Sequence, residues 1–113
     1  MRGSIVLVLA LFGAVPAVAA DPILGSWRNA AGWRAVVRPC SGQLCITLRS
    51  GPHAGTRIGN VTASGDGRYS GTVVDPATGR AYRGWATLSG RTVQLTGCLA
   101  GTAACRTETW TRR

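Results

Sequence analysis

The feature that most constrains this chain is a series of short segments in which apolar and polar residues alternate, with clusters of turn residues between them. Trp33, Ala35 and Val37, for example, fall on one face of residues 33–39. Alternation with a period of two is typical of half-buried β-strands, and no helical period is sustained after residue 20. We therefore predict about eight strands, at residues 24–29, 33–39, 44–49, 56–63, 68–74, 80–88, 92–97 and 105–112.

The turns that join these segments are short and favour antiparallel neighbours. Asp66-Gly67 is a common hairpin signal, and Pro76 fixes φ in a turn where Gly79 tolerates positive φ. The order predicts an all-β fold, a small antiparallel up-and-down barrel, whose closure removes the sheet edges. An open barrel of fewer strands and a half-open sandwich fit nearly as well. Such a barrel holds its own side chains or one small ligand, so we expect a shallow mouth rather than a spacious cavity.

The first twenty residues predict a secretory signal peptide, a helix ahead of the barrel. Arg2 supplies the positive start, residues 4–18 form an apolar core too short for a comfortable membrane span, and small residues precede Asp21. Cleavage after Ala19 or Ala20 would leave a single barrel domain, residues 21–113, in the periplasm.

Four cysteines in an exported chain of this size predict two disulfides. Three connectivities are possible. We favour Cys40–Cys45 and Cys98–Cys105, because each pair brackets a short turn-like loop, although crossed pairs stay open. Zinc is disfavoured, since the spacings differ from those of zinc ribbons and the compartment is oxidising. A chain this small has a marginal core, so covalent links are expected to stabilise it.

The charge is strongly positive, with a formal net charge of +9, 13 Arg and Lys residues together and four acidic ones. All 13 are arginines, and they are spread along the chain rather than gathered in a basic run. A diffuse positive surface suits peripheral contact with anionic envelope material such as lipid head groups. Nucleic acid is not an expected partner, because the chain is exported and carries no recognisable binding motif.

Catalysis is not expected. His53 is the only base of the usual kind, and a lone histidine in a loop is most often a solvated surface residue. Asp75 heads a turn that it is expected to cap itself, and nothing in the sequence places it beside Glu108 as an acid–base pair. So few carboxylates also argue against a metal site, and no cofactor is predicted.

Two arrangements are possible for the last strand. In one, Trp110 faces inward with Arg106, Glu108 and Arg112, and the buried glutamate and arginine must pair, which makes a polar site at a barrel mouth. In the other, which we favour, Trp110 lies outside under an arginine and the threonines face inward. Trp85 lies opposite the expected inward set of its strand and should be exposed beside Arg83, as a contact point.

Several motifs together resemble an uncharacterised bacterial family, domain of unknown function 2147. The motifs are DPILGSWRN, VVRPCSGQLC, GTVVDPATGRAYRG, VQLTGC and CRTETWTR. The resemblance spans the predicted mature chain and implies an exported, mostly β, barrel-like domain with no established activity. The chain departs from the family where Ile46 replaces the usual glycine after the second cysteine. Its segment from there to Gly59 is shorter and lacks an acidic loop, which puts in doubt any ligand contact made by that loop.

The chain is also similar to lipocalin-like barrels in one short motif, Gly25-Ser26-Trp27. That resemblance implies a tryptophan that closes one end of the barrel, with Arg106 or Arg112 packed across it in a cation–π contact. The role would be structural.

The function we expect is a non-catalytic, monomeric binding or accessory module for a small or anionic cell-envelope ligand. The alternative is a protein-interaction module, such as an inhibitor of an envelope-targeting enzyme. The candidate ligand contacts are Trp27, Tyr82, Trp85, Arg106, Glu108 and Trp110.

Overall fold

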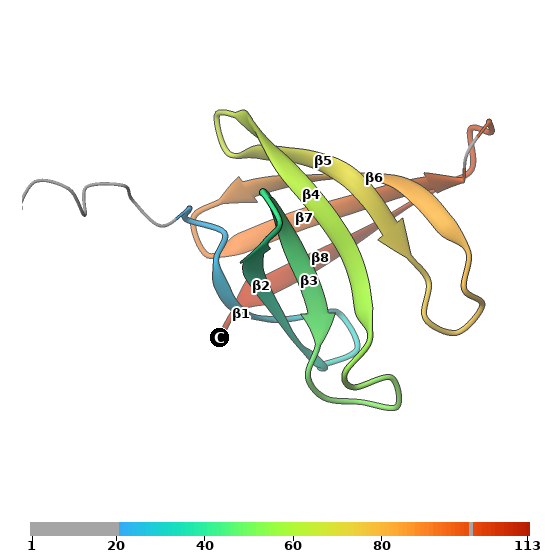
Figure 1. Ribbon diagram of the computed structural model, residues 1–113, viewed down its shortest axis with the longest axis horizontal. Coiled ribbons are helices and arrows are strands. Elements are labelled where there is room, and N and C mark those ends of the chain that lie inside the picture. Colours follow the sequence, from blue (N-terminus) through green and yellow to red (C-terminus); the bar gives the residue numbers. More distant parts are fainter. Residues whose placement is uncertain (1–20, 100) are drawn as a thin grey trace, which may run out of the picture.

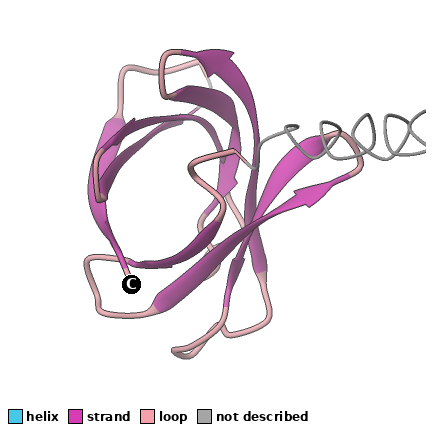
Figure 2. Ribbon diagram, turned by 90° about the vertical axis from the view of Figure 1, so that its left-hand side faces the viewer, coloured by secondary structure: helices cyan, strands magenta, loops and turns pink. Residues whose placement is uncertain are grey.

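The computed structural model describes residues 21–99 and 101–113, so the predicted signal peptide lies outside the described residues. Eight antiparallel strands form a closed barrel, in which each strand pairs with the next and β1 pairs with β8 (Figures 1 and 2). The all-β barrel predicted from the sequence is therefore confirmed. The strands are β1 (Gly25–Arg28), β2 (Arg34–Cys40), β3 (Gln43–Leu48), β4 (Arg57–Gly65), β5 (Arg68–Val74), β6 (Ala81–Ser89), β7 (Thr92–Leu99) and β8 (Cys105–Arg112).

Two-residue turns account for the tight hairpins. Asp66 and Gly67 both have positive φ, 55° and 72°, as a type I′ turn between β4 and β5 requires. Ser41 and Gly42, at 46° and 80°, make the same kind of turn between β2 and β3. These turns match the right-handed twist of the strands, so they favour the pairing of neighbours that leads to a meander.

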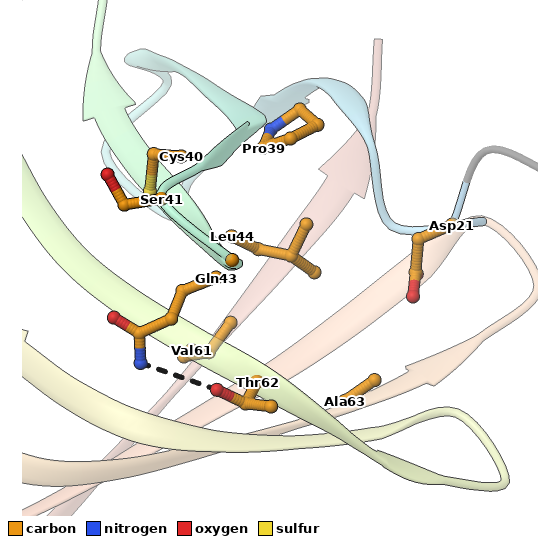
Figure 3. A pocket seen from close by; sticks show the side chains of 10 residues that line it. Asp21, Pro39, Cys40, Ser41, Gln43, Leu44, Val61, Thr62 and Ala63 are labelled. Carbon is orange, nitrogen blue, oxygen red and sulfur yellow. Dashed lines mark hydrogen bonds between the residues drawn. The ribbon is translucent and has the colours of Figure 1, made fainter.

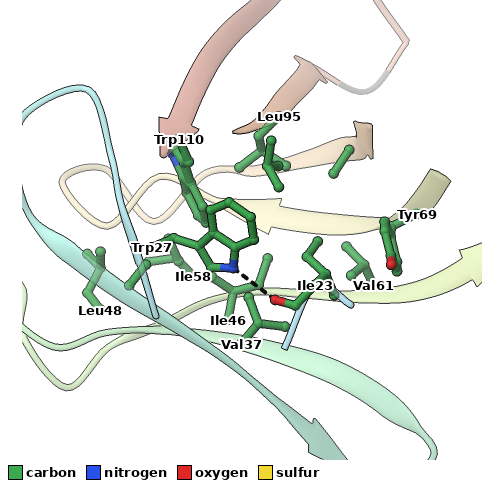
Figure 4. Close-up of a cluster of buried hydrophobic side chains, with 13 residues drawn as sticks. Ile23, Trp27, Val37, Ile46, Leu48, Ile58, Val61, Tyr69, Leu95 and Trp110 are labelled. Carbon is green, nitrogen blue, oxygen red and sulfur yellow. Dashed lines mark hydrogen bonds between the residues drawn. The ribbon is translucent and has the colours of Figure 1, made fainter. Parts of the chain in front are cut away.

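The core is built from the inward-facing residue of every second position, as alternation requires. Cross-strand pairs such as Val37 with Ile46 and Ala86 with Leu95 join one strand to the next around the barrel. Figure 4 shows the buried cluster. Its members are Ile23, Trp27, Ala35, Val37, Ile46, Leu48, Ile58, Val61, Tyr69, Ala86, Val93, Leu95 and Trp110.

The favoured arrangement of the last strand is wrong. Trp110 is only 3% exposed and belongs to the core, whereas Thr107, Thr109 and Thr111 are exposed on the outside. The reason is the cross-strand register, which places Trp110 beside the buried Val93 of β7. The inward direction of the alternative is therefore confirmed, and the inward face of β8 carries charged residues as well as a tryptophan. The pairing of glutamate with arginine that the alternative required is not made, since Glu108 bonds to Trp110 and Ala30 instead.

One end of the barrel is closed by the residues that precede and begin β1. Ile23 is buried, and its carbonyl oxygen accepts a hydrogen bond of 2.8 Å from Trp27 Nε1 (Figure 4). Arg112 lies over the Trp27 ring, 3.9 Å from its centroid. The Arg112 guanidinium also donates to the carbonyl oxygens of Leu24, at 2.8 Å, and Pro22, at 2.5 Å. The expected tryptophan–arginine closure is thus made by Arg112 and not by Arg106.

A buried tyrosine secures the same end. The Tyr69 hydroxyl donates a hydrogen bond to the carboxylate of Asp21, which also accepts one from the backbone N–H of Ile23. Burial, reinforced by the hydrogen bond to Asp21 and by its negative charge, raises the pKa of the Tyr69 hydroxyl well above 10. The hydroxyl stays protonated at physiological pH and can hold the chain ahead of β1 against β5.

The two favoured disulfides are both present, one on each of two hairpins. Cys40–Cys45 links β2 to β3, and Cys98–Cys105 links directly paired residues of β7 and β8. Disulfides persist in oxidising, extracytoplasmic compartments, so they support that location for this chain. Among residues 21–99 and 101–113, no helix has the length and apolar character needed to cross a bilayer.

Candidate functional site

The end of the barrel opposite the closed one opens into a pocket of about 540 Å³. The ends of β1, β3, β5 and β7 and the starts of β2, β4, β6 and β8 surround it. Its size is within the usual range for small-molecule sites. The wall combines buried apolar side chains with aromatic and charged ones, among them Leu48, Ile58, Val73, Leu95, Trp33, His53, Tyr82, Asp75, Arg106, Glu108 and Trp110.

Two loops bring an aromatic pair to the rim. Trp33 lies at the end of the β1–β2 turn, and His53 lies in the β3–β4 loop. Their rings pack edge to face, with centroids 6.4 Å apart. The Trp33 ring also packs on the backbone of Gly51, where an added Cβ would lie 2.6 Å from Trp33 Cδ2. Gly51 has a φ of 86°, so the loop both turns and approaches the ring closely at this residue. His53, expected at the solvated surface, is instead half-buried against the pocket.

Glycines make room inside the barrel near this mouth. Gly71, Gly84 and Gly97 are cross-strand neighbours on the inward faces of β5, β6 and β7. The Tyr82 side chain packs on Gly97, where an added Cβ would lie 3.3 Å from Tyr82 Cβ. Because Gly97 lacks a side chain, Tyr82 lies along the wall and lines the pocket. Gly84 makes room for the Val73 side chain in the same way, and Gly71 allows close approach to the backbone of Asn60 and Val61.

Glu108 is the carboxylate on the inward face of β8 at this mouth. Its Oε1 accepts hydrogen bonds from Trp110 Nε1, at 2.9 Å, and from the backbone N–H of Ala30, at 3.2 Å. These contacts tie β8 to the β1–β2 turn and hold the Trp110 ring against the pocket. The partners of Glu108 are therefore an indole and a backbone amide, in place of the arginine that was expected to pair with it.

The two inward arginines of β8 have different surroundings. Arg112, at the closed end, is half-buried and bonded to backbone carbonyl groups, whereas Arg106 is exposed and lines the open pocket. An exposed guanidinium at a pocket rim is available to an anionic group, because its donors are free to reorient toward it.

The six candidate contacts are therefore divided by the fold. Tyr82, Arg106, Glu108 and Trp110 come together around the pocket. Trp27 is fully buried in the closed end, and Trp85, 42% exposed, lies on the outer face of β6. Neither Trp27 nor Trp85 lines the pocket.

A second pocket, of about 440 Å³, lies near the β2–β3 turn at the closed end (Figure 3). Asp21 is its one ionisable wall residue, and the carboxylate is already engaged with Tyr69 and Ile23. Figure 3 shows Gln43 and Thr62 on the opposite wall, joined by a hydrogen bond of 3.3 Å. Because Asp21 is its one ionisable wall residue, this pocket offers fewer charged groups to a ligand than the open mouth, which is lined by Arg106, Glu108 and Asp75.

Residues with catalytic potential are held by local structure. Asp75 caps its own turn, as predicted, by accepting a hydrogen bond of 2.9 Å from the backbone N–H of Ala77. Within residues 21–99 and 101–113, no group of three or more histidine, cysteine or acidic residues is arranged to hold a metal ion.

Comparison with protein families identifies the chain. Residues 41–112 match the family model described as "Uncharacterized protein conserved in bacteria (DUF2147)", which is more than half of the chain. The chain belongs to this family. The matched part starts at Ser41, so the first motif of the resemblance and Cys40 lie ahead of it. No curated protein and no solved structure matches the chain. Family membership brings no known function with it.

Sequence reasoning missed Trp33 and His53 as pocket residues. Alternation put Trp33 on the same face as Ala35 and Val37, which are buried, but it did not place Trp33 at a pocket mouth. It does not say which way the side chain of a loop residue such as His53 points. The available signal was their chemistry: an aromatic residue next to the turn at residues 29–32, and a histidine in a loop rich in glycine.

Proposed function

We propose that this member of the family is a non-catalytic binding module that holds a small ligand with an anionic group at the open mouth of its barrel. The observation that carries the proposal is the pocket itself, in which exposed Arg106 stands beside a wall of aromatic and aliphatic side chains. Small-molecule sites typically combine an apolar wall with a few polar groups of this kind.

The contacts of His53 and Asp75 favour a binding role. His53 packs against Trp33, and Asp75 is bonded within its own turn. Among the described residues neither side chain has a hydrogen bond to a nucleophilic hydroxyl group, as a triad needs.

The test is a tryptophan fluorescence titration of the mature chain with phosphatidylglycerol vesicles, soluble short-chain phospholipids and small carboxylates. Trp33 and Trp110 line the pocket, so binding there should change their emission. Trp33→Phe should reduce the response, and Trp85→Phe, which alters the outer face, should keep it. A panel without any response from Trp33 or Trp110 would contradict the proposal.

We also propose that the chain works in the periplasm after its signal peptide is removed. The arginine and apolar core of residues 2–18 support export, and the two disulfides are compatible with it. Fractionation of the native host followed by intact-mass measurement tests this. A cut after Ala19 or Ala20 is expected, and an uncut protein in the cytoplasm would contradict it.

The second candidate function is a protein-interaction module, such as an inhibitor of an envelope-targeting enzyme. It is favoured by Trp85, the exposed large hydrophobic residue of the described chain, which lies beside Arg83 on the outer face of β6. Pull-down from an envelope extract with wild type and Trp85→Ala separates the two functions, because only a protein partner bound at this face should be lost in the variant.

A further inference from the structure

We propose that the open mouth selects an amphipathic zwitterion, that is, a ligand with an amino group next to its acidic group and an apolar tail. This inference rests on the proposed function and concerns the same pocket. It starts from the opposite charges that β8 presents there, Arg106 and Glu108, two positions apart on one inward face. Residues at this separation in a strand are about 7 Å apart at their backbones, so long side chains from both can reach one small ligand.

The free oxygen of Glu108 is the central observation. Both hydrogen bonds to this carboxylate, from Trp110 and from Ala30, go to Oε1. Among the described residues no side-chain polar atom is buried without a hydrogen-bond partner, so Oε2 is accessible. A carboxylate oxygen on a pocket wall attracts a cationic donor and repels a second acid.

Arg106 supplies the complementary preference. Its guanidinium is exposed at the same rim and matches a carboxylate or phosphate in shape as well as charge. A ligand with only an acidic group would be repelled by the negative charge of Glu108. A ligand with only an amino group would be repelled by the positive charge of Arg106. A ligand that carries both groups has a partner for each.

The rest of the wall accounts for the apolar tail. Leu48, Ile58 and Leu95 are buried residues that also line the pocket, so they lie at its deep side. Trp33 and Tyr82 are half-buried and flank the entrance of the pocket. An aliphatic or aromatic tail would therefore be buried below the charged head, which the hydrophobic effect favours.

Three probes with the same eight-carbon chain test the inference by calorimetry: 2-aminooctanoate, octanoate and octylamine. Wild type should bind 2-aminooctanoate about tenfold or more tightly than either of the others, since each lacks one charge-assisted contact. Glu108→Gln keeps an oxygen for Trp110 and Ala30, and should lower the preference for 2-aminooctanoate over octanoate to about twofold or less without weakening octanoate. Thermal unfolding of the variant provides the control for its fold.

Arg106→Gln is the matched variant, and it should weaken 2-aminooctanoate and octanoate alike while leaving octylamine unchanged or tighter. If octanoate binds wild type as tightly as 2-aminooctanoate, the inference is overturned and the proposed function stands. If none of the three probes binds, the inference is also overturned, and the proposed function is then decided by the wider fluorescence panel.

Discussion

The two ends of the barrel are built from the same strand faces but differ in how their polar groups are satisfied. At the closed end, Arg112 covers Trp27 and bonds to backbone carbonyl groups, and Tyr69 bonds to Asp21. At the open end, Arg106 is exposed at the pocket rim, and Glu108 lies on the pocket wall. Asp21 and Glu108 each accept their two hydrogen bonds through a single oxygen, so the difference between the ends lies in the two arginines. A polar group that is satisfied within the chain stabilises the fold, whereas one with unused capacity can bind a ligand.

This contrast lies within a single strand. Every second residue of β8 faces inward. From the open end to the closed one, these residues are Arg106, Glu108, Trp110 and Arg112. Substitutions at the Arg112 end of β8 should therefore affect mainly the stability of the fold. Substitutions at the Arg106 end should affect mainly ligand binding.

The largest expected effect is at the closed end. Trp27→Ala removes a fully buried side chain and its hydrogen bond to Ile23, and should lower the free energy of unfolding by about 3–5 kcal/mol. Trp33→Ala, at the half-buried rim of the open end, should cost clearly less. Urea unfolding of both variants measures the difference, and equal losses would break the contrast between the ends.

Removal of either disulfide should come next. Each closes a short loop, so Cys40→Ser with Cys45→Ser, or Cys98→Ser with Cys105→Ser, should cost about 2 kcal/mol. The first pair is on the hairpin at the closed end, and the second borders the open mouth. Thermal unfolding with and without reductant checks both, and only loss of the second pair is expected to change ligand binding.

The paired arginine variants sharpen the comparison directly. Arg112→Gln loses the contact with Trp27 and weakens the bonds to the chain ahead of β1, so it should cost about 1–3 kcal/mol. Arg106→Gln alters an exposed side chain and should change stability by less than about 0.5 kcal/mol. A reversal of this order in urea unfolding would contradict the roles given to the two residues.

Alkaline pH should weaken the closed end selectively. The pKa of Tyr69 is raised in the folded protein above its ordinary value near 10, so the folded state holds the proton more tightly than the unfolded state. The free energy of unfolding contributed by the protonated Tyr69 hydroxyl is fully present below about pH 10. It falls as pH rises from there toward the pKa of Tyr69 in the folded protein. Tyr69→Phe should abolish this alkaline fall in stability, and Tyr82→Phe, at the open mouth, should keep it. Melting temperatures between about pH 9 and pH 11 measure the effect.

Much of the fold follows from local pattern. Alternation and turn residues located all eight strands, and those at 68–74 and 105–112 have the predicted bounds. The weak, glycine-interrupted segment after residue 55 became the long strand β4, because pairing with β3 and β5 stabilises it from both sides. The disulfides followed from spacing and compartment.

The orientation of β8 could not be settled in this way. Its two faces, one of threonines and one of Trp110 with charged residues, each suit a strand on local grounds. The choice depends on the neighbours across the sheet, Val93 and Leu95, whose own inward direction fixes that of Trp110 and Glu108. The site depends equally on Trp33 and His53, which the β1–β2 and β3–β4 connections bring together across two intervening strands.

The most direct test of the two-ended barrel is acrylamide quenching of two proteins that each retain one tryptophan, Trp27 or Trp33, with phenylalanine at the other three positions. Trp27, fully buried beneath Arg112, should be almost unaffected by the quencher, and Trp33 at the mouth should be quenched readily. Equal quenching of the two in folded protein would contradict the account of one closed and one open end.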